Sequence, residues 1–144
     1  MNLLQLSTKV RYAARAMIDL AMNYKGEPIQ LNEIACNQNI SVKYLEQIMG
    51  PLRAKGIVRT QKGSKGGYHL AADPEEITLY DIVESIEGSM APVSCVDDTS
   101  SCDRHDTCVT RQVWARMKDV VSEELKSKTL ADLAADQSKV DKAI

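Results

Sequence analysis

The sequence predicts a mainly α-helical fold with one small β-hairpin. Three observations carry this prediction: two short helical segments joined by a tight turn, a glycine-rich basic hairpin directly after them, and a long apolar stripe at helical spacing near the C-terminus. A helix-turn-helix followed by such a hairpin is a winged helix. The chain of 144 residues is long enough for one domain of this kind with an appended helix.

The first predicted helix extends from Leu6 to Ala21, where apolar residues recur at helical spacing. Ser7 is a candidate N-cap, and the segment 26–28 (Gly-Glu-Pro) ends the helix. The first segment therefore forms a single amphipathic helix.

A helix-turn-helix is predicted from residue 31 to residue 55. Leu31 to Asn37 forms a short helix, residues 38–40 form a turn, and Ser41 caps a third helix from Val42 towards Lys55. Pro51 lacks a backbone donor, so we expect the third helix to kink or restart there.

The wing is predicted by two β-prone segments, 57–61 and 68–71, around the glycine-rich tip at 62–67. After it, Thr78 and Asp81 form a capping-box signal for a helix over 79–87.

The C-terminal half begins with an irregular segment and then returns to helical periodicity. Residues 88–107 show no periodicity, which predicts a loop or a disordered tip. A helix is predicted from Val109 to about Leu125, and it is too long for the small core, so its apolar stripe is expected to pack on a second copy. Thr129 starts a short last helix, and we expect the chain from Asp136 onward to fray.

Charge is divided unevenly along the chain. Residues 1–70 hold ten Lys and Arg against four Asp and Glu, a net charge of +6, whereas residues 71–144 hold eight against sixteen, a net charge of −8. A basic half suits a polyanion such as DNA. Because the sequence shows neither a membrane-length apolar stretch nor a signal peptide, we expect a cytoplasmic protein without membrane association. No catalytic constellation stands out, so an enzyme is not predicted.

The N-terminal part of the third helix and the wing supply the candidate DNA-binding residues. In a helix-turn-helix, the second helix enters the major groove and its first residues meet base edges. Glu46 can accept a hydrogen bond from cytosine, and Gln47 can pair with adenine. The candidate set is Ser41, Lys43, Tyr44, Glu46 and Gln47 in the helix and Arg59, Lys62, Lys65, Gly66 and Gly67 in the wing.

Three cysteines, Cys95, Cys102 and Cys108, lie in or at the end of the irregular segment. Thiolates suit soft metal centres, above all iron–sulfur clusters, and their spacing is wider than in most zinc sites. A zinc site and a thiol switch remain alternatives. Cys36, in the second predicted helix, is interpreted as a small packing residue, and His69 as structural.

Several segments together resemble the Rrf2 family of winged helix-turn-helix repressors, and in particular its iron–sulfur branch. They are Ser7-Thr8-Lys9, Tyr12-Ala13, Arg15-Ala16, Ile40-Ser41, Tyr44-Leu45-Glu46-Gln47, Gly66-Gly67-Tyr68 and the three-cysteine loop before a long helix. The resemblance implies a homodimer, crossed through the long helix, that binds palindromic double-stranded promoter DNA. It also implies that Glu46 helps to discriminate between promoter classes and that Cys95, Cys102 and Cys108 bind the cluster.

Two positions depart from the family pattern. The iron–sulfur branch carries a histidine ligand three residues after its last cysteine, where this chain has Arg111, which stays protonated and cannot ligate. His105 is the preferred fourth ligand, with Asp103, Asp106, an outside thiol or water as alternatives. A [2Fe–2S] cluster is slightly preferred over [4Fe–4S]. In the wing, Lys62 replaces the arginine of the relatives and loses its planar fork.

The sequence thus predicts a winged helix-turn-helix DNA-binding domain at 1–88, a cysteine-containing sensor loop at 89–108, and a dimerisation helix with a C-terminal tail at 109–144. The expected function is that of a regulator of cluster-assembly or related stress genes, by resemblance a repressor, whose cluster state controls promoter affinity. A thiol-redox or nitric-oxide sensor without a stable cluster, and a metal-buffer protein, are the alternatives.

Overall fold

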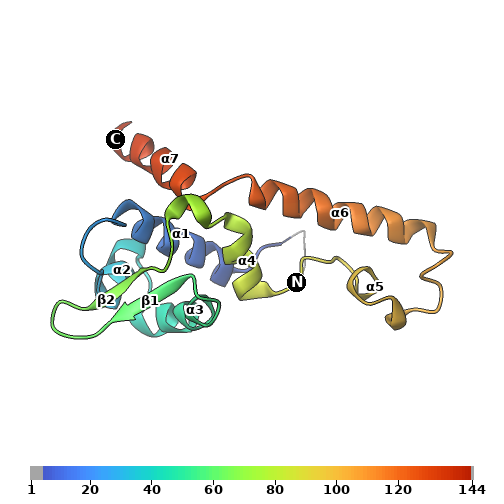
Figure 1. Ribbon diagram of the computed structural model, residues 1–144, viewed down its shortest axis with the longest axis horizontal. Helices are drawn as coiled ribbons and strands as arrows, with labels where there is room; N and C mark the ends of the chain where they lie inside the picture. The colour runs from blue at the N-terminus through green and yellow to red at the C-terminus, as the bar shows by residue number, and fades with distance from the viewer. Residues whose placement is uncertain (1–4, 144) are drawn as a thin grey trace.

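The computed structural model describes residues 5–143, and its elements follow the predicted order (Figure 1). The helices are α1 (Thr8–Met22), α2 (Leu31–Gln38), α3 (Val42–Ala54), α4 (Leu79–Glu87), α5 (Ser94–Asp97), α6 (Val109–Lys126) and α7 (Leu130–Ala143). The strands are β1 (Val58–Gln61) and β2 (Gly67–Leu70), and short 3-10 turns lie at η1 (Pro74–Glu76) and η2 (Thr99–Ser101). The fold is mainly helical with one hairpin, as the sequence predicts.

The helix-turn-helix forms where the caps place it. Ser7 Oγ accepts a hydrogen bond from the N–H of Val10 at the start of α1, and Ser41 Oγ accepts one from the N–H of Tyr44 at the start of α3. Asn39, with φ of 55°, ends α2 in the left-handed conformation. The two helices therefore meet through a short, well-defined turn.

The expected restart of α3 at Pro51 does not occur. The helix continues through the proline to Ala54. Ile48 and Met49 before the proline and Leu52 after it are all buried, so both halves are held against the same core. Tertiary packing outweighs the one missing backbone donor.

The wing is a two-stranded antiparallel sheet in which Val58 pairs with Leu70 and Gln61 with Gly67. A backbone bridge between Ile29 and Tyr68 attaches this sheet to the segment before α2, through N–H···O bonds of 2.9 and 2.7 Å. The hairpin is therefore tied to the helix-turn-helix at its base.

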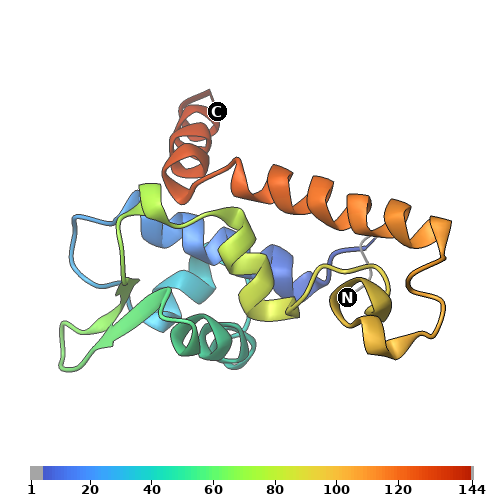
Figure 2. The ribbon, with the colours of Figure 1, turned by 45° about the vertical axis from the view of Figure 1, so that its right-hand side comes forward.

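The core lies between α1, α2, α3 and α4, with the wing along one side. Its largest fully buried side chains include Met17, Ile34, Leu45, Ile48 and Ile82. The hairpin and α3 lie on the side of α1 that is opposite α7 (Figures 1 and 2). The predicted DNA-binding surface on α3 and the hairpin and the C-terminal helix α7 therefore lie on opposite sides of the domain.

The prediction of a frayed C-terminal tail from Asp136 is wrong. α7 is a continuous helix to Ala143 and packs against α1. Thr129 and Asp132 cap its start reciprocally, with each backbone N–H donating to the other's side chain. Leu130 is fully buried in the main core, which fixes the helix to the domain. This anchor outweighs the weak apolar pattern of the rest of α7.

α6 extends beyond the body of the domain at its N-terminal end (Figure 1). Its C-terminal half packs through Val121 and Leu125 on a small cluster that contains Val83 of α4. Its N-terminal half is open, with Val109 74% and Val113 54% exposed. No α6 residue is buried within the single chain. Between residues 5 and 143, no helix combines the length and apolar content of a membrane span.

Candidate nucleic-acid interface and cysteine segment

The candidate residues of the recognition helix lie on its exposed side. Lys43, Glu46 and Gln47 are exposed, whereas Leu45 and Ile48 of the same helix are fully buried. Helical spacing therefore directs the buried pair to the core and the polar side chains outward. Ser41 is exposed but already accepts the capping bond, and Tyr44 is half-buried.

The basic wing residues are exposed, but the two glycines are not free surface. Arg59, Lys62 and Lys65 are exposed on β1 and the hairpin tip. A Cβ on Gly66 would lie 2.0 Å from the carbonyl oxygen of Gln61, and one on Gly67 would lie 2.4 Å from that of Ile29. Packing within the chain therefore explains both glycines without a ligand.

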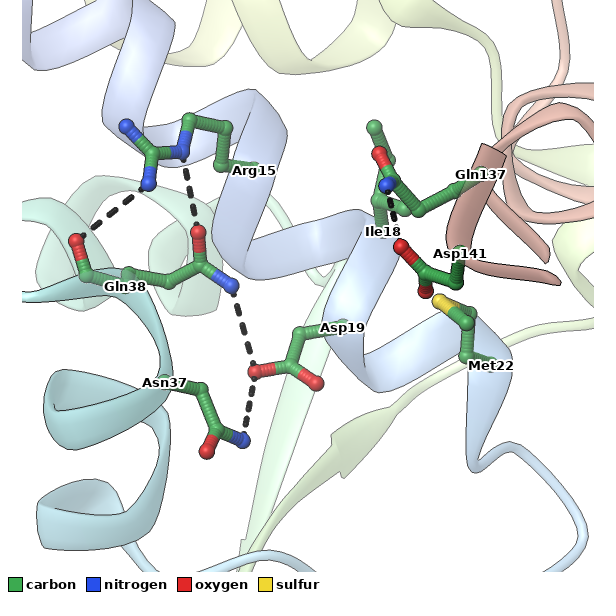
Figure 3. Close-up of a pocket in the computed structure, with 8 residues that line it drawn as sticks. All are labelled: Arg15, Ile18, Asp19, Met22, Asn37, Gln38, Gln137 and Asp141. Carbon is green, nitrogen blue, oxygen red and sulfur yellow. Dashed lines mark hydrogen bonds between the residues drawn. The ribbon is translucent and has the colours of Figure 1, made fainter. Parts of the chain in front are cut away.

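The recognition helix is held by a network on α1 that the sequence alone does not indicate. The rings of Tyr12 and Tyr44 meet edge to face, with centroids 6.0 Å apart. Arg15 lies over the Tyr12 ring and donates from Nε to Gln38 Oε1 at 2.9 Å. Asp19 accepts bonds from the amides at the end of α2, as Figure 3 shows. Apart from the family resemblance, the sequence gives no signal for Tyr12 or Arg15, because their partners are distant along the chain.

The three cysteines predicted to form the sensor are free thiols spread along the segment between α4 and α6. Figure 2 shows this segment beside the N-terminal end of α6. Cys95 is half-buried in α5, Cys102 is exposed after η2, and Cys108 is half-buried immediately before α6. A hydrogen bond with the Thr110 hydroxyl at 3.2 Å, aided by the backbone N–H of Arg111, lowers the pKa of the Cys108 thiol.

Although its sequence shows no periodicity, this segment contains two short helical turns, α5 and η2. Asp98 begins η2 by accepting from the N–H and the hydroxyl of Ser100, which also lowers the pKa of its carboxyl. The segment is thus locally hydrogen-bonded rather than a featureless loop.

His105, the preferred fourth ligand, has both ring nitrogens engaged. Nδ1 lies 3.0 Å from the carbonyl oxygen of Cys102, and Nε2 lies 3.0 Å from Asp106 Oδ1. Among residues 5–143, no three His, Cys, Asp or Glu side chains gather in a way that could hold a metal ion. Three thiols suit a cluster chemically, but this arrangement does not hold them together, so the ligand assignment stays a prediction.

Two side chains of α6 attach the cysteine segment to the long helix. Arg111 Nε donates to the carbonyl oxygen of Cys95 at 3.0 Å, and Lys118 Nζ donates to Asp97 Oδ1 at 2.7 Å. The Lys118 bond, followed by one from Ser89, holds the pKa of the Asp97 carboxyl below its ordinary value. Arg111, which replaces the expected histidine, therefore has a structural task at this position.

The interpretation of Cys36 as a packing residue is wrong, because Cys36 is exposed on α2. Its neighbours Ile34 and Ala35 fill the core side of this helix instead. His69 is half-buried, and its Nδ1 lies 3.0 Å from the carbonyl oxygen of Leu70. This burial and this contact agree with the interpretation of His69 as a structural residue.

Comparison with known proteins places this geometry in a family. The Rrf2 family, described as "Iron-dependent Transcriptional regulator", matches residues 6–136. The chain is 38% identical to Protein rrf2 of Nitratidesulfovibrio vulgaris, covering 94% of this chain and 90% of that protein. It is 39% identical to the HTH-type transcriptional regulator CymR of Bacillus subtilis, covering 92% and 91% of the two chains.

Solved structures agree with the fold. The structure of CymR, the global cysteine regulator of B. subtilis, superposes with a TM-score of 0.76 at 40% identity, over 91% of this chain and 96% of that chain. The structure of T. potens IscR superposes with a TM-score of 0.78 at 37% identity, over 94% and 90%. CymR and IscR are thus about equally similar, and the specific resemblance to the iron–sulfur branch is not resolved. The family consists of transcriptional regulators, not enzymes, and the winged helix-turn-helix described above is its DNA-binding fold. This chain belongs to the Rrf2 family of DNA-binding transcriptional regulators.

Proposed function

We propose that this regulator is a homodimeric repressor that senses iron–sulfur supply, or the oxidative or nitric-oxide stress that damages clusters, through Cys95, Cys102 and Cys108. The observation that carries the proposal is the position of these thiols. All three lie on the one segment that joins α4 of the DNA-binding domain to the long helix α6. A change in this segment therefore acts on both elements.

In this proposal, α3 enters the major groove of promoter DNA and the wing contacts the adjoining backbone or minor groove. Glu46 and Gln47 read base edges, and Lys43 and Tyr44 hold phosphates or bases. Arg59, Lys62 and Lys65 neutralise phosphates from the wing. The assignment is supported by the exposure of these charged and amide side chains and by the position of α3 and the hairpin on one side of the domain (Figure 1). Such a protein acts on DNA in the cytoplasm.

The proposed dimer interface is the open part of α6. Val109, Val113 and Val120 are 74%, 54% and 47% exposed, and apolar side chains so exposed along one helix favour burial against a second copy. Two copies would place two recognition helices on one palindromic site.

Coupling between the cysteine segment and DNA binding follows from contacts of this chain. The three thiols do not gather in this structure, so binding one centre requires the segment to rearrange. Arg111 and Lys118 bond this segment to α6, so they would transmit such a rearrangement to the long helix. α6 in turn packs on α4 through Val121. A bound cluster would supply a centre that is lost on oxidation or reaction with nitric oxide. The two states of the segment would thereby favour different placements of the recognition helices.

The comparisons support an iron-linked signal. The family description names iron, and IscR is among the structural relatives. Direct thiol sensing is a second candidate, which a specific observation favours. The three thiols do not gather at one point in this structure, and Cys102 is exposed. In addition, the structure of an oxidised form of Staphylococcus aureus CymR superposes with a TM-score of 0.71 at 38% identity, over 90% of this chain and 95% of that chain.

The experiment is a visible absorption spectrum, with assays of iron and acid-labile sulfide, on full-length protein purified without oxygen. The proposal predicts brown protein whose colour and iron are lost in Cys102→Ala. Cys36→Ala is the matched control, because Cys36 is also an exposed cysteine but lies on α2. The ratio of iron to chain distinguishes [2Fe–2S] from [4Fe–4S]. Colourless protein after reconstitution would refute the cluster and leave thiol sensing.

A further inference from the structure

The side of α1 that faces α2 and α3 carries Tyr12, Arg15 and Asp19, which we call the α1 support face. The three positions follow one another at intervals of about one helical turn, so they share one side of the helix. Their partners lie on both sides of the turn that separates α2 from α3.

Arg15 and Asp19 hold the C-terminal end of α2. Arg15 donates from Nε to Gln38 Oε1 at 2.9 Å and from Nη2 to the Gln38 carbonyl oxygen at 3.4 Å. That carbonyl belongs to the last turn of α2, where carbonyl groups lack partners within the helix. Asp19 Oδ2 accepts bonds from the amides of Asn37, at 3.1 Å, and Gln38, at 3.4 Å (Figure 3). α1 therefore fixes the end of α2 by four side-chain bonds.

Tyr12 extends this support to the recognition helix. The Arg15 guanidinium carbon lies 4.9 Å from the centroid of the Tyr12 ring, within the range of a cation–π contact. The Tyr12 ring meets the Tyr44 ring at an angle of 88°. Tyr44 lies in the first turn of α3, beside the residues proposed to meet base edges. The contacts thus link the end of α2, α1 and the start of α3.

We propose that Tyr12 and Arg15 are positioning residues for sequence discrimination. They fix the orientation of α3 relative to α2, and Arg15 does not itself bind a phosphate. Its guanidinium is already engaged by Gln38 and covered on one side by the Tyr12 ring. The inference rests on the proposed role of α3 in base contact.

The matched control for Arg15 is Arg11, which lies on the same helix, is also exposed and carries the same charge. Its recorded side-chain bond is to Thr8 Oγ1, at 3.2 Å, within α1. Arg11→Ala therefore removes the same charge as Arg15→Ala without touching the contacts to Gln38.

The test compares the affinities of the full-length protein for two duplexes. One is selected from a random-sequence library by the unaltered protein, and the other is a scrambled duplex of the same length. We expect Arg15→Ala and Tyr12→Leu to lower affinity for the selected duplex about tenfold, the size of one lost base contact. Affinity for the scrambled duplex and the dependence on salt stay unchanged. Tyr12→Phe, which keeps the ring, retains discrimination.

Three results would overturn the proposal. Equal weakening on both duplexes, with the salt slope reduced by about one, would make Arg15 a phosphate contact. Equal losses in Tyr12→Phe and Tyr12→Leu would assign the effect to the hydroxyl. Discrimination that is unchanged in Arg15→Ala, or lowered as much in Arg11→Ala, would remove the support role. Circular dichroism verifies that each variant keeps its helix content.

Glu46→Ala separates this inference from the proposed function. If Glu46→Ala lowers discrimination and Arg15→Ala does not, only the positioning role fails. If Glu46→Ala leaves discrimination unchanged, the proposed contact between Glu46 and a base fails, whatever the result for Arg15→Ala.

Discussion

The attachment of the wing at Gly67 gives a sharp test of the fold that presents the DNA-binding surface. Gly67 has a φ of +154°, and a Cβ there would lie 2.4 Å from the carbonyl oxygen of Ile29. Gly67→Ala must therefore displace the Ile29 segment and weaken the two backbone bonds between Ile29 and Tyr68. Each bond contributes about 0.5–1.5 kcal/mol net. The unfavourable backbone conformation adds about 1–3 kcal/mol.

Together these costs predict a loss of about 3 kcal/mol in the free energy of unfolding for Gly67→Ala. With a urea m-value of about 2 kcal/mol per molar, the midpoint should fall by about 1.5 M. The assay is urea denaturation followed by circular dichroism, at one fixed protein concentration because a dimer's stability depends on it.

Gly50→Ala is the matched control. Gly50 is exposed in α3, and apart from its chain neighbours and the nearby backbone of its own helix, a Cβ there meets no atom within 4 Å. Alanine has a higher helix propensity than glycine by about 0.5–1 kcal/mol, whereas the ring of Pro51 crowds a Cβ on the residue before it, so we expect only a small net change in stability. A Gly67→Ala variant within about 0.5 kcal/mol of the unaltered protein would refute the packing explanation and restore a functional reason for this glycine.

Three further predictions concern α7 and the cysteine segment. Leu130→Ala should lower the free energy of unfolding by about 2–5 kcal/mol, since this side chain is fully buried where α7 joins the core. Lys118→Ala should speed modification of Cys95 by a thiol reagent several-fold at pH 7, because it removes the 2.7 Å bond that holds α5 on α6. Lys118 lowers the pKa of Asp97, so their ion pair is intact above the ordinary pKa of 3.8 and is lost as the pH falls through the lowered pKa. An NMR titration of the Asp97 carboxyl should therefore give a midpoint below 3.8. In Lys118→Ala this midpoint should rise towards 3.8.

Each of these predictions has a control or a contrary result. Val140→Ala, on the exposed side of α7 at 55% exposure, should leave stability nearly unchanged, and equal effects at Leu130 and Val140 would contradict the packing of α7. Arg116→Ala removes a positive charge on α6 that lies 3.8 Å from Glu123, and it should not alter Cys95 reactivity. An Asp97 midpoint that is unaffected by Lys118→Ala would show that the ion pair does not form.

The elements of the winged helix were predictable because local signals agree with the tertiary fold. Ser7, Ser41 and the Thr78–Asp81 capping box each mark a helix start that the structure retains. The strands lie within about one residue of their predicted ends because the glycine-rich tip separates two β-prone runs.

The local sequence pattern underestimates α7 because the stability of this helix depends on one long-range contact. The helix carries few large apolar residues, and its decisive contact is Leu130 against a core formed much earlier in the chain. Pro51 was overestimated for the converse reason, since buried neighbours on both sides keep α3 continuous. In both cases packing outweighs local propensity.

The candidate site divides in the same way. Exposure of Lys43, Glu46 and Gln47 follows directly from helical spacing. The roles of Arg111 and Arg15 do not, because each bonds a group more than a dozen residues away, at Cys95 and Gln38 respectively. The spacing of the cysteines along the sequence does not specify whether their three thiols come together around an iron–sulfur cluster.

The central claim is that the state of the cysteine segment controls DNA binding. Its most direct test measures affinity for the selected duplex in one anaerobic preparation, before and after removal of the cluster by a chelator, with the triple variant of Cys95, Cys102 and Cys108 to alanine in parallel. We expect the affinity to change about tenfold or more on cluster loss, and the affinity of the triple variant to match that of the cluster-free protein. Equal affinity in both states of the unaltered protein would contradict it.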